Sequence, residues 1–177
     1  MHRLFVAVRP PEPIRDLLID AMDDNPDFRW QNDEQLHLTL RFIGEVDRPI
    51  AEDLANALSR VRAERFSIRI NGVGRFEQRS GGALWAGVEP KEPVAALAAK
   101  VERACQQVGL EPEHRAFHPH ITLARWKGRR SREVQAYLEA HRGLSSEPFT
   151  VDDFMLFESR LSRHGAQYEP VETYALC

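Results

Sequence analysis

Hydrophobic and polar residues follow two different periods along this chain, which predicts that strands and helices alternate. Residues 3–8 (RLFVAV) form an apolar run rich in β-branched and aromatic side chains, typical of a buried strand. Prolines interrupt the pattern within residues 10–13. Apolar side chains then recur with a helical period, which predicts an amphipathic helix to about residue 23, with Ile14, Leu17, Leu18 and Ala21 on its inner face.

The patterns further along predict more elements of both kinds. Strands are expected at residues 28–30, 36–43, 66–70, 73–77, 83–88, 120–126, 149–157 and 167–176. Helices are expected at about residues 48–61, 93–108 and 131–142. Asp47 and Ser131 are the expected N-caps of the first and third of these helices. Residues 79–82 (RSGG) predict a flexible turn.

Each half of the chain therefore has the order strand, helix, strand, helix, strand. The interval from His37 to Phe66 is 66 − 37 = 29 residues, and the interval from His120 to Phe149 is 149 − 120 = 29 residues. Equal spacing with divergent sequence indicates a duplication.

The duplication predicts one bilobal domain over residues 1–177, with halves of roughly 1–82 and 83–177. The fold class is α+β, in which each lobe has an antiparallel sheet with outer helices. We expect the lobes to be related by a pseudo-twofold axis around a central cleft, and exchange of strands between the lobes is compatible with this arrangement.

Two copies of the pattern His-x-Thr-Leu occupy equivalent places in the two halves, at residues 37–40 and 120–123. Alternate side chains of a strand share a face, so each His should point the same way as the Thr two residues later, with the apolar residues in the core. With seven His and four Thr in 177 residues, random placement predicts about 0.16 His-x-Thr triplets. We therefore interpret the two copies as half-sites that face one cleft.

Composition and charge limit the classes of function. The chain has 42% hydrophobic and 29% charged residues, which are values of globular proteins. A net charge of −3 argues against broad electrostatic capture of duplex nucleic acid but leaves room for a local basic cleft. The apolar run at residues 4–8 is too short for a signal sequence or a membrane span, so we expect a cytoplasmic protein without membrane contact. Cys105 and Cys177 form neither a disulfide framework nor a metal knuckle.

Paired histidines suit displacement at phosphorus, in which the attacking and leaving oxygens lie on opposite sides of the phosphoryl group. One imidazole can accept the proton of the nucleophile while the other donates a proton to the leaving oxygen, since both protonation states are accessible near neutral pH. The hydroxyls of Thr39 and Thr122 could donate to the other phosphate oxygens. This chemistry requires no metal or other cofactor.

Two other classes of function remain open at this point. In the first, His37, His118 and His120 bind a metal ion, although no carboxylate or cysteine stands at a familiar ligand spacing and the paired Thr are then unexplained.

In the second, the chain is a non-catalytic RNA- or nucleotide-binding module. The bases of the bound RNA or nucleotide would stack on Trp30, Phe117 or Trp126. Aromatic residues at strand ends are more often part of a core.

The sequence resembles the RNA 2′,3′-cyclic phosphodiesterases, also called 2′-5′ RNA ligases, of the two-histidine phosphoesterase superfamily. The matching pieces are residues 3–8, Arg29-Trp30, residues 37–45 (HLTLRFIGE) and residues 117–125 (FHPHITLAR). The resemblance implies a bilobal α+β fold and metal-independent hydrolysis of a ribose 2′,3′-cyclic phosphodiester to a 2′-phosphomonoester, with reversible 2′-5′ ligation as a related activity. The implied partners are RNA ends or small nucleotides that bear a 2′,3′-cyclic phosphate, and we expect a monomer.

Carried over to this chain, the resemblance makes His37 the proton donor to the 3′ oxygen and His120 the proton acceptor that activates water. Thr39 and Thr122 would bind phosphate oxygens. The two half-sites are nearly equivalent, so the sequence alone does not decide which histidine is the donor.

Three neighbouring residues are further candidates. Arg125 matches the family pattern and could neutralise phosphate, but strict alternation puts it on the opposite face from His120, so the strand would have to end or twist. Arg41 is expected to share the His37 face and to contact phosphate or RNA. His118 is expected at the rim, on the His120 side. A basic lip at residues 127–130 is interpreted as a solvated loop.

Overall fold

An antiparallel sheet of nine strands forms the centre of the computed structural model, which describes residues 1–177. The strands are β1 (His2–Val8), β2 (Arg29–Trp30), β3 (Leu38–Val46), β4 (Phe66–Gln78), β5 (Gly81–Glu89), β6 (His120–Lys127), β7 (Phe149–Val151), β8 (Asp153–Ser162) and β9 (Gly165–Ala175). Their order is β7-β4-β5-β6-β3-β1-β8-β9, and β2 pairs with β6. The α+β class with antiparallel pairing is confirmed.

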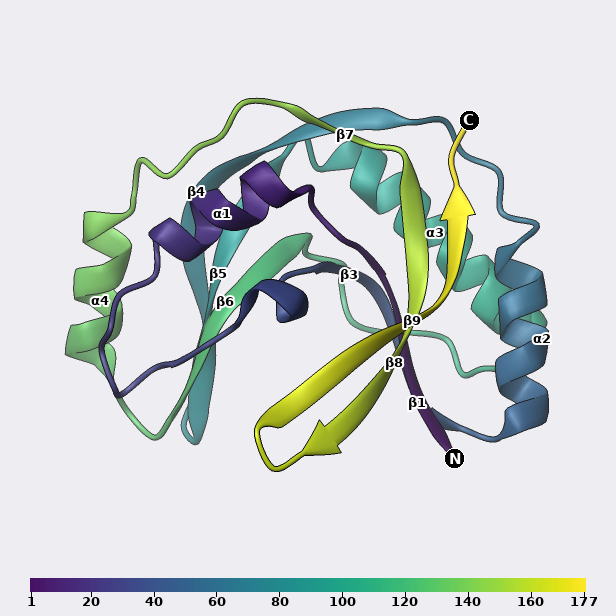
Figure 1. The fold of residues 1–177 in the computed structure, drawn as a ribbon, viewed down its shortest axis with the longest axis horizontal. Coiled ribbons are helices and arrows are strands. Elements are labelled where there is room, and N and C mark those ends of the chain that lie inside the picture. Colours follow the sequence, from purple (N-terminus) through teal and green to yellow (C-terminus); the bar gives the residue numbers. More distant parts are fainter.

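Four helices lie against this sheet: α1 (Glu12–Asp20), α2 (Arg48–Leu58), α3 (Glu92–Gln107) and α4 (Ser131–Ala140). A short 3-10 helix, η1 (Asp33–Gln35), precedes β3. Helices α2 and α3 lie side by side, and α4 lies at the opposite side of the molecule (Figure 1). No helix is long and apolar enough to cross a membrane.

Strands β3 and β6 carry the two motifs and meet at the middle of the sheet. A single residue pair, Leu38 with Ile121, joins them, whereas the neighbouring strand pairs share longer ladders. On one side of this joint, β4 from the first half of the chain pairs with β5 from the second. On the other side, β8 from the second half pairs with β1 from the first. The third long strand of each half thus lies beside the first strand of the other half.

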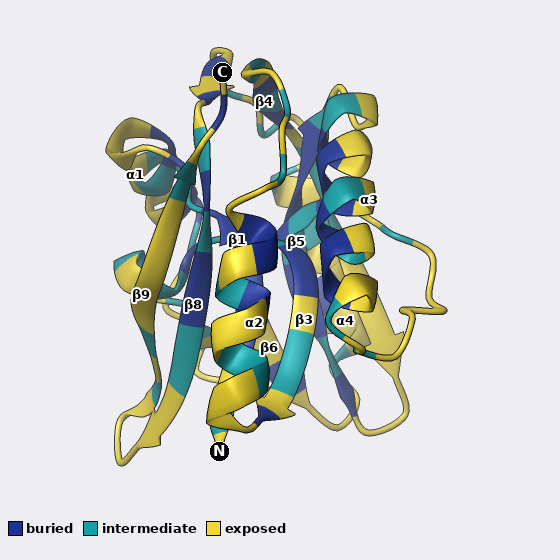
Figure 2. Ribbon diagram, turned by 90° about the vertical axis from the view of Figure 1, so that its right-hand side faces the viewer, coloured by how far each residue is buried: buried dark blue, intermediate teal, exposed yellow.

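The apolar residues of both motifs are anchored in one core cluster of 35 buried residues. Leu38, Leu40, Ile121 and Leu123 are all at most 5% exposed, so the backbone that carries the polar motif residues is held firmly. Figure 2 shows that the buried positions of the helices face the strands, while the edge strand β9 is largely exposed.

Most element ends agree with the sequence patterns, and the exceptions have local causes. The side chain of Asp47 accepts a hydrogen bond from the Ile50 N–H, which confirms this N-cap. Ser131 is wrong as an N-cap, because it is the first residue of α4 and Arg130 precedes it without a side-chain cap bond. The expected strand at 149–157 is interrupted at Asp152, which separates β7 from β8.

The turn expected at residues 79–82 is shorter, because Gly81 and Gly82 belong to β5. A Cβ at Gly82 would collide with the carbonyl of Phe76 and with the ring of Trp126. Glycine at this position therefore lets strands approach closely instead of providing a flexible turn.

Candidate active site

His37 and His120 are held by the same local contact in the two half-sites. Nδ1 of His37 donates to the backbone carbonyl of Gln35 at 2.6 Å, and Nδ1 of His120 donates to the backbone carbonyl of His118 at 2.6 Å. A carbonyl oxygen only accepts, so the neutral form of each ring carries its proton on Nδ1. In both rings Nε2 is then the nitrogen that can accept or donate a proton at a substrate.

Aromatic side chains surround both imidazoles. The His37 ring lies 4.8 Å from the ring of Phe5 on β1 and perpendicular to Tyr168 on β9 at 5.3 Å, measured between centroids. The His120 ring lies perpendicular to Phe76 on β4 at 4.8 Å and 6.0 Å from Trp85 on β5. Each ring is thus fixed in orientation by strands from both halves of the chain.

Burial lowers the pKa of both histidines. Desolvation is the main cause for His37, with further contributions from the charges of Arg125, His120 and Arg9, and it lowers the pKa of His37 to about 4. The hydrogen bond to Gln35 opposes the shift. Desolvation also lowers the pKa of His120, with Arg125 and His118 as charged neighbours. An anion between the rings would act in the opposite direction, because it favours the charged imidazole.

Both motif strands contain a β-bulge at the fourth residue of the motif. In β3, Thr39 pairs with Ala7 and Arg41 pairs with Val6, so Leu40 has no partner. In β6, Thr122 pairs with Trp85 and Ala124 pairs with Leu84, so Leu123 has no partner. An extra residue in one strand reverses the alternation of side chains beyond it. Counted from the His as the first residue, the sixth residue and not the fifth is then expected on the face of the His and the Thr. These sixth residues are Phe42 and Arg125.

The bulge at Leu123 places Arg125 on the face of His120 and Thr122, as its exposure and its effect on both histidines show. The strand neither ends nor needs an unusual twist there, because β6 continues to Lys127.

Arg41 is among the residues that line the groove described below, but its guanidinium has partners that the sequence did not predict. The bulge at Leu40 turns Arg41 to the helix side, where its Nε donates to a carboxylate oxygen of Glu102 at 2.6 Å. The guanidinium also donates to the backbone carbonyls of Glu111, at 2.5 Å, and Phe42. Only 9% of Arg41 is exposed, and its hydrogen bonds hold α3 and the loop after it against β3.

A groove of about 900 Å³ runs over this face. It brings together Thr39, His120 and Arg125, with His118 exposed in its wall. His37 and Thr122 lie beside the groove and are not among the residues that line it. The charges of His120 and Arg125 nevertheless reach His37 strongly enough to lower its pKa.

Phe42 and Arg29 are two of the groove residues that the sequence did not predict as site residues. Phe42 is 43% exposed there, as the sixth residue of the first motif. Arg29 on β2 lies directly opposite Arg125 on β6. Arg29 belongs to a piece that matches the family pattern, but the pattern alone does not reveal this pairing between distant segments.

The residues of the two alternative classes of site are not brought together as a set. No group of three or more His, Cys, Asp or Glu side chains is placed to hold a metal ion. Trp126 is 5% exposed, and the half-buried Trp30 packs against Phe28 and Tyr137. Of the three aromatic residues considered for stacking, Phe117 and the buried Trp126 line the groove, whereas Trp30 does not.

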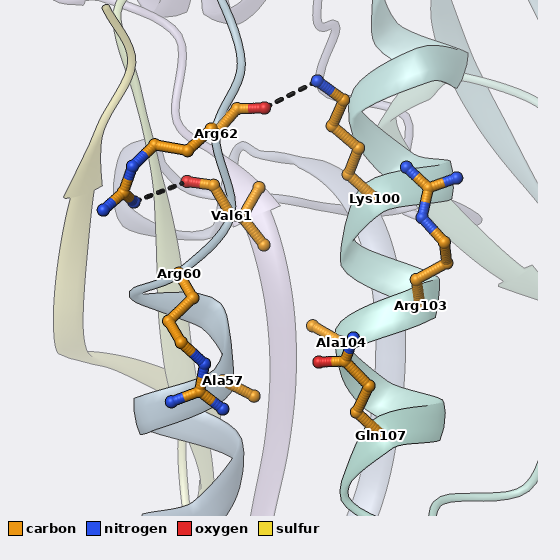
Figure 3. Close-up of a pocket in the computed structure, with 8 residues that line it drawn as sticks. All are labelled: Ala57, Arg60, Val61, Arg62, Lys100, Arg103, Ala104 and Gln107. Atoms are coloured by element: carbon orange, nitrogen blue, oxygen red, sulfur yellow. Dashed lines mark hydrogen bonds between the residues drawn. The ribbon is translucent and has the colours of Figure 1, made fainter.

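A second hollow, of about 410 Å³, lies between α2 and α3 and is rich in cations (Figure 3). The cations do not converge on one point. The guanidinium of Arg62 turns back to the carbonyl of Val61, and Nζ of Lys100 donates to the carbonyl of Arg62. The hollow contains no imidazole, carboxylate or thiol, so it offers no group for proton transfer.

Comparisons with known proteins agree on one family. A family model described as the 2′-5′ RNA ligase superfamily matches residues 9–163. The chain is 36% identical over 140 residues to the RNA 2′,3′-cyclic phosphodiesterase of Aeropyrum pernix, which covers 77% of this chain and 80% of that protein. It is 28% identical over 185 residues to the enzyme of the same name from Escherichia coli, and this alignment covers 99% of this chain and 97% of that protein.

The fold also agrees with solved structures. The crystal structure of E. coli LigT in apo form superposes with a TM-score of 0.83 at 28% identity, over 99% of this chain and 97% of that chain. E. coli LigT complexed with 3′-AMP gives a TM-score of 0.83 at 27% identity, over 99% and 98%.

Proposed function

The chain belongs to the 2′-5′ RNA ligase superfamily, and from this premise we propose that it hydrolyses a 2′,3′-cyclic phosphodiester to a 2′-phosphomonoester. The substrate is an RNA end or a small nucleotide that bears this group. Relatives named RNA 2′,3′-cyclic phosphodiesterase and a LigT structure with 3′-AMP support the proposal. The observation that carries it is the pair of Nδ1–carbonyl hydrogen bonds, which directs both Nε2 atoms to acid–base work.

In the proposed reaction, the oxygen of a water molecule attacks phosphorus while the bond from phosphorus to the 3′ oxygen breaks. Nε2 of His120 takes a proton from the water, and protonated His37 gives its Nε2 proton to the leaving 3′ oxygen. The 2′ oxygen keeps the phosphate. The roles of the two histidines follow the family resemblance.

The surroundings of His37 disfavour this proton, because burial lowers the pKa of the ring to about 4. The negative cyclic phosphate must therefore supply the missing stabilisation when it binds between the rings. Protonation of His37 and binding of the substrate are then coupled, so the imidazole is charged mainly while the substrate is bound.

The other motif residues hold the phosphate in this proposal. The hydroxyls of Thr39 and Thr122 donate to the non-bridging oxygens. The guanidinium of Arg125 offsets the negative charge that grows on the phosphate in the transition state. No metal ion takes part, and 2′-5′ ligation would be the same displacement with the 5′ hydroxyl of a second RNA in place of water.

The test is to incubate the protein, with a strong chelator, with an RNA that ends in 2′,3′-cyclic phosphate and to identify the product terminus. We expect a 2′-phosphate. His37→Ala and His120→Ala should each lower kcat/KM by about 10²–10⁴-fold or more. His164→Ala is the matched control, because His164 is exposed and lies outside the groove.

A 3′-phosphate product or full activity of either motif variant would contradict the mechanism. Because one chain supplies both histidines, we also propose that a monomer is sufficient. Activity per chain should then not change when the protein is diluted, and gel filtration at the assay concentration gives its mass.

A further inference from the structure

Arg29 and Arg125 form a pair of like charges across two neighbouring strands. They are direct partners in the antiparallel ladder between β2 and β6, so their side chains share the groove face. Both are exposed, and neither makes an ion pair with a carboxylate within 4.0 Å. Asp27, an acidic residue close to β2 in the sequence, lies instead beside Arg130, at 3.6 Å.

Like charges that face each other on adjacent strands destabilise a sheet. A protein that keeps such a pair without a carboxylate leaves its charge available for an anion from outside. Arg125 already acts on the reacting centre, because its charge lowers the pKa of both His37 and His120. Arg29 lies on β2, one strand away from the strand that carries His120 and Arg125. Its positive charge is therefore additional to the charge of Arg125 that would neutralise one cyclic phosphate.

The register of the central strands gives the groove two different ends. Leu38 pairs with Ile121 in antiparallel fashion, so the two motifs extend in opposite directions from this point. One end therefore carries Arg125 and Arg29, and the other carries Phe42. The side chains of Gln78 and Ser80, near the far end of β6, add neutral hydrogen-bonding groups to the cationic end.

We propose that Arg29 binds the phosphodiester that links the terminal nucleotide of an RNA to the nucleotide before it. This inference rests on the proposed function and names the part of the substrate that the cationic end receives. Arg29 thereby distinguishes an RNA end from a free cyclic mononucleotide, which has no such phosphate.

The experiment compares two substrates, a mononucleoside 2′,3′-cyclic phosphate and a dinucleotide that ends in 2′,3′-cyclic phosphate. The quantity measured is the ratio of kcat/KM for the dinucleotide to kcat/KM for the mononucleotide. Arg29→Gln should lower this ratio about tenfold or more, since it removes a charged hydrogen bond to phosphate. Arg29→Lys, which keeps the charge, should recover part of it.

The salt dependence provides a second measurement. For the dinucleotide, the slope of log kcat/KM against log salt should become shallower by about 0.7 in Arg29→Gln, as expected for one lost phosphate contact to a single strand. Arg132→Gln is the control, because Arg132 is an exposed cation on α4 outside the groove and should change neither quantity.

A ratio in Arg29→Gln that equals the wild-type ratio would overturn the inference, whether both substrates are unaffected or both are slowed equally. The conservative Arg29→Lys variant keeps this test valid if the Gln variant folds poorly. Failure of the proposed function looks different, because the wild-type protein would then open neither substrate.

Discussion

The half-buried ring of His37 should make the stability of the folded protein depend on pH. Its pKa is lowered from 6.5 to about 4, mainly because burial disfavours the charged imidazole. The unfolded chain therefore binds more protons than the folded chain between these two values. The stability contributed by neutral His37 is complete above pH 6.5 and is lost as the pH falls through this window towards 4.

The lowered pKa corresponds to roughly 3 kcal/mol of unfolding free energy when the ring is fully protonated, and about 2 kcal/mol of this is lost between pH 7.5 and pH 5. His37→Gln keeps a polar side chain that takes up no proton. Its unfolding free energy should therefore fall by about 2 kcal/mol less than that of the wild type over the same pH interval.

Urea unfolding followed by circular dichroism at pH 7.5 and pH 5 measures this difference. His164→Gln is the control, because the exposed ring of His164 should leave the pH dependence of the wild type intact. Saturating inorganic phosphate should reduce the difference between wild type and His37→Gln, since an anion beside the ring raises its pKa. Equal losses in wild type and His37→Gln, without phosphate, would refute the reasoning.

Further predictions concern the phosphate contacts, the pH profile and the structural arginine. Thr39→Val and Thr122→Val should each lower kcat/KM by roughly tenfold or more, because each loses a hydrogen bond to a charged group, and steady-state kinetics on a cyclic mononucleotide tests this. The pH profile of kcat for the wild type should be bell-shaped, since one histidine must be charged and the other neutral, and a flat profile between pH 5 and 8 would argue against two titrating groups. Arg41→Ala should cost on the order of 3 kcal/mol of unfolding free energy, because it leaves Glu102 without its partner, and chemical denaturation measures it. An unchanged midpoint in Arg41→Ala would show that the ion pair does not stabilise the fold.

The sequence predicted the alternation within each motif correctly, because two-residue periodicity is a local property of a strand. Leu38 and Leu40 are buried and Thr39 between them is half-buried, as the pattern indicated. The side of Arg41 could not be predicted, since a bulge adds a residue without a distinctive residue type at Leu40.

Other parts of the site depend on contacts between distant segments. Tyr168 reaches His37 from β9, and Arg29 meets Arg125 through the pairing of β2 with β6. Strand register between segments so far apart in the chain is set by the packing of the whole sheet, so a local pattern does not contain it. The motif thus supplied the groups that the proposed mechanism uses, whereas their surroundings required the structure.

The bulges at Leu40 and Leu123 divide each motif into a part that is constrained and a part that is free to vary. Beyond the bulge, the fifth residue is held by the interior, as Arg41 by Glu102 and Ala124 by its complete burial. The residue after it, Phe42 in one strand and Arg125 in the other, lines the groove. If the two motifs act as the proposed half-sites, each copy can acquire a different substrate preference through one exposed side chain, while the histidines and threonines stay as they are.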